Sequence, residues 1–108
     1  MITDIRFSQE FERAFKQLKK KYPSITTDFK CLLLSLIDNP FQGVELSGGK
    51  RKIRLAITSK QRGKSGGARV IVKVAIIESR LSILYIYDKA DMSNVSEAFL
   101  DEILKNMH

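Results

Sequence analysis

The feature that most constrains the fold is a strict alternation of apolar and polar residues in two segments, 52–58 and 69–76. The apolar residues at alternate positions are Ile53, Leu55 and Ile57 in the first segment and Val70, Val72, Val74 and Ile76 in the second. Because successive side chains of a β-strand point to opposite faces, each segment predicts a strand with one apolar face. If the two strands pair, a slip of one residue would expose every one of these apolar side chains, so the register is fixed.

The same register predicts that four basic residues share the opposite face of this strand pair. They are Lys52, Arg54, Arg69 and Lys73. Like charges that face one another across a strand pair destabilise it. A bound polyanion accounts for such an arrangement more simply than a structural role does.

The positive charge of the chain is local. Nine of the 19 basic residues and none of the 12 acidic residues lie in segment 50–77, so the rest of the chain carries a net charge of −2 against +7 for the whole. A basic strand pair on a nearly neutral body is typical of a protein that binds phosphate groups. We therefore expect nucleic acid as the partner, with Lys50, Arg51, Lys60, Arg62, Lys64 and Lys73 among the residues that bind it; the family resemblance given below implies that this nucleic acid is RNA.

The connection between the two strands, 59–67, contains the tripeptide Gly63-Lys64-Ser65, which suggests a comparison with a P-loop. The first glycine of that motif would fall at position 58, which is Thr58, and the motif should open a helix. A run of β-branched residues follows instead. The comparison fails, and the sequence predicts no nucleotide triphosphate site.

The rest of the chain predicts one further strand and a helix pair before this strand pair, and a strand and a helix after it. The expected elements are a short strand at 2–7, a helix to about Tyr22 capped by Ser8, a helix at 27–38, a strand at 81–87 and a last helix capped by Ser93 or Ser96. The segment 41–49 is read as a turn-rich connection. The order β-α-α-β-β-β-α predicts a single α+β domain over residues 1–108, with a small, mainly antiparallel sheet, an N-terminal helix pair and a C-terminal helix.

Several classes of site are excluded by composition. The chain has one cysteine and one histidine, His108, so neither a zinc site nor a histidine-centred triad can be assembled. Cys31 lies in an apolar run and is expected to be a buried thiol, which fits a reducing cytoplasm. We expect no signal peptide and no membrane partner, because the N-terminus lacks an apolar core and no apolar stretch approaches transmembrane length.

Three segments, in this order and at this spacing, are similar to those of the RelE/HigB toxins of bacterial toxin-antitoxin modules. They are GGKRKIRL at 48–55, GKSGGARVI at 63–71 and LYIYDK at 84–89. The resemblance implies a RelE-like fold and a small basic protein that cleaves mRNA, in most members on the ribosome, without a metal or other cofactor. It also implies neutralisation by a cognate antitoxin protein.

The resemblance also implies roles for individual residues. Lys52 and Arg54 match the two cations that contact the message backbone, and Arg69 matches the arginine that stabilises charge on the scissile phosphate. Lys89 matches the lysine after the last strand, and Lys64 the loop lysine of the HigB-like branch. The chain departs from RelE at Ala90 and Ser96, where RelE has an arginine and a tyrosine, and from many HigB-like members at Val72 and Lys73, where they carry aromatic residues.

RNA cleavage without a metal uses the neighbouring 2′-hydroxyl as nucleophile and needs a proton acceptor, a proton donor and cations around the transition state. A lysine among other cations can act as the acceptor, because its pKa is lowered. The candidates for catalysis are therefore Lys52 as base, Lys89 as second base, and Arg54 and Arg69 as stabilising cations, with the Arg69 side chain expected to face solvent.

Two other functions fit the same sequence. A ParE-like relative would share the fold but inhibit a topoisomerase by protein contact, although its cations would be expected on the C-terminal segment. A catalytically decayed module would still bind RNA through its basic face, and Ala90 and Ser96 favour that alternative.

Overall fold

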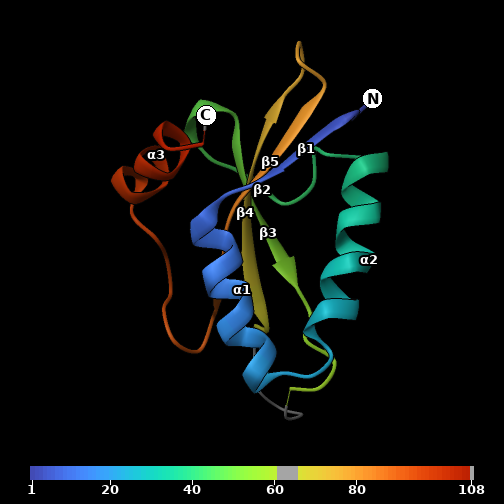
Figure 1. The fold of residues 1–108 in the computed structure, drawn as a ribbon, viewed down its shortest axis with the longest axis vertical. Coiled ribbons are helices and arrows are strands. Elements are labelled where there is room, and N and C mark those ends of the chain that lie inside the picture. Colours follow the sequence, from blue (N-terminus) through green and yellow to red (C-terminus); the bar gives the residue numbers. More distant parts are fainter. Residues whose placement is uncertain (61–65, 108) are drawn as a thin grey trace.

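A computed structural model describes residues 1–60 and 66–107, which form a five-stranded sheet of order β1-β5-β4-β3-β2 with three α-helices (Figure 1). The strands are β1 (Asp4–Phe7), β2 (Val44–Glu45), β3 (Lys50–Leu55), β4 (Ala68–Ala75) and β5 (Arg80–Asp88). The helices are α1 (Gln9–Lys21), α2 (Ile25–Asp38) and α3 (Glu97–Lys105), and the short 3₁₀-helix η1 (Ser47–Gly49) precedes β3. Only β1 runs parallel to its neighbour, β5.

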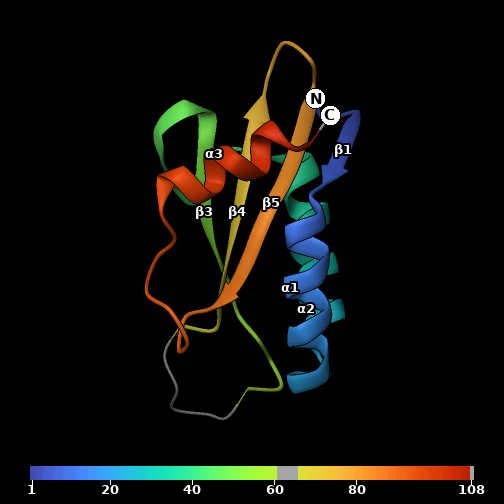
Figure 2. The ribbon, with the colours of Figure 1, turned by 60° about the vertical axis from the view of Figure 1, so that its left-hand side comes forward.

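The sheet lies between two helical layers. The antiparallel helices α1 and α2 cover one face, and α3 crosses the other (Figures 1 and 2). This arrangement confirms the predicted α+β class, the helix pair and the C-terminal helix, and adds the two-residue strand β2 and η1 within the turn-rich connection. Within the described ranges, no helix is both long enough and apolar enough to span a membrane.

The larger core lies between the sheet and the helix pair. It includes the predicted inward residues Ile53, Leu55 and Ile57 of the β3 segment and Val70, Val72 and Val74 of β4. Four phenylalanines from β1 and the two helices pack around one another beside it, with ring centroids 5.1–6.4 Å apart: Phe7, Phe11, Phe15 and Phe29. The alternation in the sequence therefore identified the correct inner face of the strand pair.

The smaller core lies under α3. Leu100 and Ile103 of the helix pack on Ile71, Leu84 and Tyr87 of the sheet. A β-bulge shifts the register of β4 and β5, so that Ile71 pairs with Tyr85 whereas Val72 pairs with Ile83. Leu84 is the extra residue of this bulge, and its side chain belongs to the smaller core.

Two predicted positions are wrong. Ile76 was expected to point inward, but β4 ends at Ala75 and Ile76 is 69% exposed in the turn that follows. Cys31 was expected to be buried, but it is exposed. It lies two residues after the buried Phe29, which places it about 200° around the helix, on the outer side of α2.

Ser8 joins α1 to the sheet. Its Oγ accepts a hydrogen bond of 2.8 Å from the Phe11 N–H, as the predicted N-cap, and donates one of 2.6 Å to the Leu84 carbonyl. The side chain is almost completely buried. Ser96 caps α3 through the Phe99 N–H at 3.1 Å but is exposed.

We expect Ser8→Ala to lower the free energy of unfolding by about 2–3 kcal/mol, because it removes a cap and leaves the buried Leu84 carbonyl with one bond fewer. The exposed cap provides the control, since Ser96→Ala should cost about 1 kcal/mol or less. Urea unfolding of both variants measures the difference, and equal losses would show that the bond to Leu84 contributes nothing.

Candidate nucleic-acid interface

The predicted basic face forms on the side of the sheet that α3 partly covers. Across β3 and β4, Arg54 pairs with Arg69 and Lys50 pairs with Lys73, while Lys52 pairs with the α3-facing Ile71. Cross-strand partners lie on the same face. All the cations named for this face from the alternation, Lys52, Arg54, Arg69 and Lys73, therefore lie together on it.

Lys52, Arg54 and Lys73 are the most accessible members of this face. Arg54 is exposed, and Lys52 and Lys73 are half-buried. None of the three forms an ion pair with the part of the chain that the structure describes. Their charges remain uncompensated, as expected for side chains that bind phosphate.

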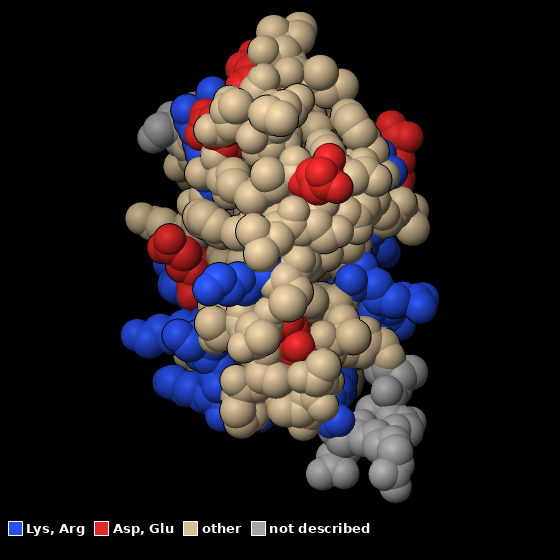
Figure 3. Space-filling model, turned by 90° about the vertical axis from the view of Figure 1, so that its right-hand side faces the viewer, with Lys and Arg blue, Asp and Glu red and all other residues tan. Residues whose placement is uncertain are grey.

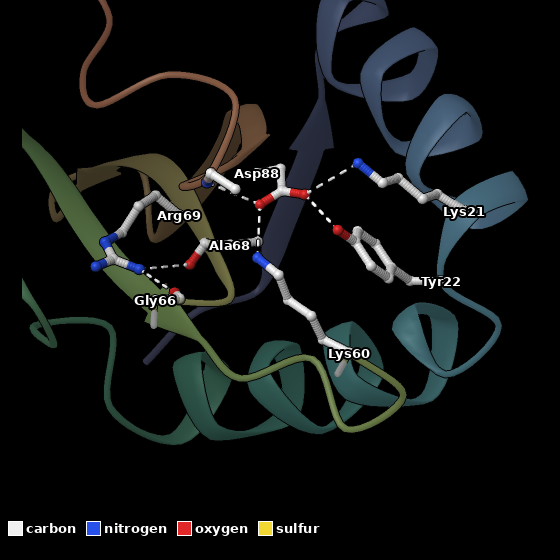
Figure 4. Close-up of polar contacts among 8 residues, drawn as sticks. Lys21, Tyr22, Lys60, Gly66, Ala68, Arg69 and Asp88 are labelled. Atoms are coloured by element: carbon white, nitrogen blue, oxygen red, sulfur yellow. Dashed lines mark hydrogen bonds and ion pairs between the residues drawn. The ribbon is translucent and has the colours of Figure 1, made fainter. Parts of the chain in front are cut away.

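Arg69 does not face solvent as predicted, since only 9% of it is exposed. Its Nη1 donates hydrogen bonds to the carbonyls of Gly66 and Ala68 (Figure 4). The reason is local: the chain approaches β4 through Gly66 and Gly67, which adopt φ of +91° and +51° and turn the backbone onto the guanidinium. Arg69 is thus held in place by the glycine turn rather than extended into water.

The same turn brings Lys89 beside Arg69. The Lys89 N–H bonds to the Gly67 carbonyl at 3.0 Å, and a Cβ at Gly66 would lie 2.7 Å from the Lys89 Cγ and 3.8 Å from the Arg69 Nη1. Only glycine fits between the two side chains. The structure therefore brings together two residues that are 20 positions apart in the sequence and that were both predicted to act at the site.

Three other predicted RNA-binding cations are engaged within the protein. The Lys50 Nζ lies 3.4 Å from Glu97 and 3.2 Å from Asp101 of α3, and the residue is only 3% exposed. The Arg51 Nε donates to the Gln42 carbonyl at 2.8 Å, and the Lys60 Nζ lies 2.8 Å from Asp88. These contacts engage Lys50, Arg51 and Lys60 within the fold, and their assignment as RNA-binding residues stays a prediction. Arg62 and Lys64 lie outside the described residues.

Basic side chains also occur away from this face. In Figure 3, which looks onto the side formed by α2, lysines and arginines gather along both margins while the middle carries few charges. The outer side of α2 is therefore not part of a continuous basic surface.

A buried carboxylate, that of Asp88, lies close to Arg69 but on the opposite side of the sheet, the side that the helix pair covers (Figure 4). Asp88, whose side chain is inaccessible to solvent, accepts hydrogen bonds from the Tyr22 hydroxyl at 2.5 Å, the Lys60 Nζ at 2.8 Å and the Ala90 N–H at 2.9 Å. Lys21 approaches to 3.7 Å. Burial by itself would raise the pKa of Asp88, but the bonds from Lys60, Tyr22 and Ala90 outweigh it and lower the pKa to about 2.

Sequence reasoning missed Tyr87, which completes a row across three strands. Tyr87 of β5 pairs with Arg69, which in turn pairs with Arg54. Its hydroxyl is buried without a hydrogen-bond partner among the described residues, and burial raises its pKa, an effect that Arg69 partly offsets. Its position in the segment LYIYDK could have drawn attention to it. A simple alternation would still assign Tyr87 to the wrong face, because it does not account for the bulge in β5.

We expect the protein to lose about 2 kcal/mol of stability as the pH falls from 3.8, the ordinary pKa of an aspartate, to about 2. Over this range the aspartate of the unfolded chain takes up a proton, whereas Asp88 of the folded protein stays charged, so acid favours the unfolded state. This contribution is fully present above pH 3.8. Asp88→Asn should remove that part of the pH dependence and cost about 3–5 kcal/mol at pH 7. Unfolding of wild type, Asp88→Asn and the exposed-site control Asp91→Asn across this range measures it, and an unchanged acid slope in Asp88→Asn would contradict the assignment.

Tyr87→Phe and Tyr22→Phe delete the same atom with opposite expected results. Removing the unpaired Tyr87 hydroxyl should raise the free energy of unfolding by about 1 kcal/mol, whereas removing the Tyr22 hydroxyl should lower it by about 1–3 kcal/mol. Thermal unfolding of both variants tests the difference. Destabilisation by Tyr87→Phe would show that its hydroxyl has a partner in the folded protein.

No protein-family model matches the chain, but solved structures do. The free state of an arginine-to-alanine double mutant of the E. coli toxin RelE superposes with a TM-score of 0.59 at 16% identity, over 100% of both chains. The isolated E. coli RelE toxin gives 0.54 at 17% identity over 94% of this chain and 96% of that one, and the double mutant in complex with a peptide of the antitoxin RelBc gives 0.54 at 16% over 100% of both. The chain therefore has the fold of the RelE toxin.

Proposed function

We propose that this protein is the toxin of a type II toxin-antitoxin module and cleaves mRNA, on the ribosome and without a metal. The observation that carries the proposal is the row Arg54, Arg69 and Tyr87, with Lys52 one step along the sheet and Lys89 beside Arg69. The RelE fold supports it, because this row lies on the strands whose motifs resemble RelE.

The row contains two arginines in different environments, one accessible to solvent and one held in place by the protein. Arg54 is exposed and can hold the RNA backbone, whereas Arg69 is fixed in place by the glycine turn. Its Nε and Nη2 form no hydrogen bond with the described residues, so they can donate to a phosphate. A pre-oriented guanidinium stabilises the developing charge without reorganisation, which is the largest contribution in most such sites.

Proton transfer is assigned to the neighbouring groups. The 2′-oxygen attacks the phosphorus and gives its proton to Lys52, with Lys89 as the second candidate, while the bond to the 5′-oxygen breaks. This leaves a 2′,3′-cyclic phosphate and a 5′-hydroxyl, whose oxygen takes up one proton. The Tyr87 hydroxyl, which has no partner among the described residues and belongs to the residue that pairs with Arg69, is the candidate donor for it, in place of the RelE tyrosine that this chain lacks at Ser96.

The cognate partner of such a toxin is an antitoxin protein. A structural neighbour, the E. coli RelE double mutant, was solved with an antitoxin peptide, which supports the same kind of partner here. A toxin with an uncompensated basic face must be blocked before it meets ribosomes. Carboxylates on a segment of the antitoxin can bind this face and block it.

Arg69→Gln tests the catalytic assignment. Glutamine keeps a donor for the carbonyl of Gly66 but removes the charge, so the protein should fold while mRNA cleavage in a ribosome-containing translation extract falls about 100-fold, and growth inhibition is lost. Thermal unfolding checks the fold. Growth inhibition by wild type without any mRNA cleavage would overturn the proposal in favour of a target such as a topoisomerase, and RNA binding without growth inhibition would indicate a decayed module.

Binding should depend on salt in a residue-specific way. Arg54→Ala and Lys52→Ala should each reduce the slope of log affinity against log salt by about one, because each removes one phosphate contact. Lys30→Ala, on the exposed side of α2, removes the same charge away from the face and should leave the slope unchanged. Fluorescence anisotropy with a single-stranded RNA oligonucleotide measures all three, and equal slopes in the three variants would place the RNA elsewhere.

A further inference from the structure

A continuous groove runs between α1 and α3, apart from the Arg54–Arg69–Tyr87 row. It consists of three connected hollows of about 520, 490 and 430 Å³. The first and second share Glu10 and Arg13, and the second and third share Tyr85 and Phe99. We call this feature the α1–α3 groove.

The groove exists because β5 is longer than its outer neighbour. β1 pairs with β5 only from Arg80 to Ile83, after which Ser8 turns the chain into α1. The remaining residues of β5, 84–88, pair with no strand on that side within the described part of the chain. The open edge lies between one wall made by α1 and another made by α3.

The α1 wall is basic. Arg13, Lys16 and Lys20 line the groove and are exposed, and none forms an ion pair with the described residues. The spacing of i, i+3 and i+7 places them along one side of the helix over about 10 Å. Glu10 is the one acidic residue among those that line the three hollows. A partner that occupies the groove should therefore be acidic.

Aromatic and aliphatic side chains gather at one end of the groove. Phe99 and Met92 are 38% and 39% exposed, and both line the end of the groove with the half-buried Tyr85. Tyr85 already stacks on Tyr87 at 6.3 Å and meets Phe99 at 83°, so little of its ring is free for a nucleobase to stack on. Base stacking needs an open ring face, whereas aliphatic side chains can fill the space around ring edges.

We propose that the α1–α3 groove binds an acidic amphipathic segment of a partner protein, whose carboxylates pair with Arg13, Lys16 and Lys20 and whose apolar side chains pack on Tyr85, Phe99 and Met92. The proposal rests on the proposed function, in which that partner is the antitoxin. It assigns the antitoxin a contact that leaves α3 in place and lies beside the RNA-binding row instead of on it.

The test compares two double variants of the full-length protein that change charge equally. Lys16→Glu/Lys20→Glu reverses two charges in the groove, and Lys19→Glu/Lys30→Glu reverses two exposed charges outside it. The probe is the protein encoded by the reading frame beside this one, and its affinity is measured by surface plasmon resonance. The groove variant should bind at least tenfold more weakly, mainly through slower association, and the control variant should stay within about twofold of wild type.

Phe99→Ala tests the apolar half, and should shorten the residence time of the complex at least fivefold with little change in association rate. Thermal unfolding checks that both groove variants fold, and RNA affinity and mRNA cleavage should stay at the wild-type level. Wild-type-like binding of both groove variants would overturn the proposed surface alone. Loss of RNA affinity in the charge variant with antitoxin binding intact would instead show an RNA surface. If wild type neither binds the probe nor inhibits growth, the proposed function fails and the groove assignment with it.

Discussion

The buried carboxylate of Asp88 connects three parts of the chain that the sequence separates widely. Tyr22 ends α1, Lys60 follows β3, and Asp88 itself ends β5. A buried charge without its partners is strongly unfavourable, so these contacts form together or not at all. Asp88 also pairs across the sheet with Ala68, whose carbonyl holds Arg69. One strand position thus joins the buried Asp88 carboxylate on one side of the sheet to the carbonyl that Arg69 contacts on the other.

The basic residues of β3 divide into two groups with different roles. At the start of the strand Lys50 is neutralised by Glu97 and Asp101, which fixes α3 on the sheet. Further along, Lys52 and Arg54 have no acidic neighbour among the described residues and remain available. One strand thus uses its first lysine to hold a helix and leaves its later cations without an ion pair among the described residues.

The sequence predicted what local patterns determine. The alternating residues of β3 and β4 assigned their inner faces, Ser8 was identified as a cap, and the shared basic face followed from the register. The contacts of Lys50 and Lys60 could not be predicted, because their carboxylates lie 47 and 28 positions away and nothing local marks the pairing. Arg69 was misplaced for a similar reason. Its exposure depends on how Gly66 and Gly67 turn, which composition does not specify.

The bulge at Leu84 determines which face of the sheet each later side chain of β5 points to. Before it, odd-numbered residues such as Ile83 face the helix pair, and after it even-numbered ones such as Ile86 do. Deleting Leu84 would turn Tyr87 of the Arg54–Arg69–Tyr87 row toward α1 and the carboxylate of Asp88 toward α3, where neither has its partners. One inserted amino acid thus keeps the Asp88 carboxylate and the Arg54–Arg69–Tyr87 row on opposite sides of the sheet.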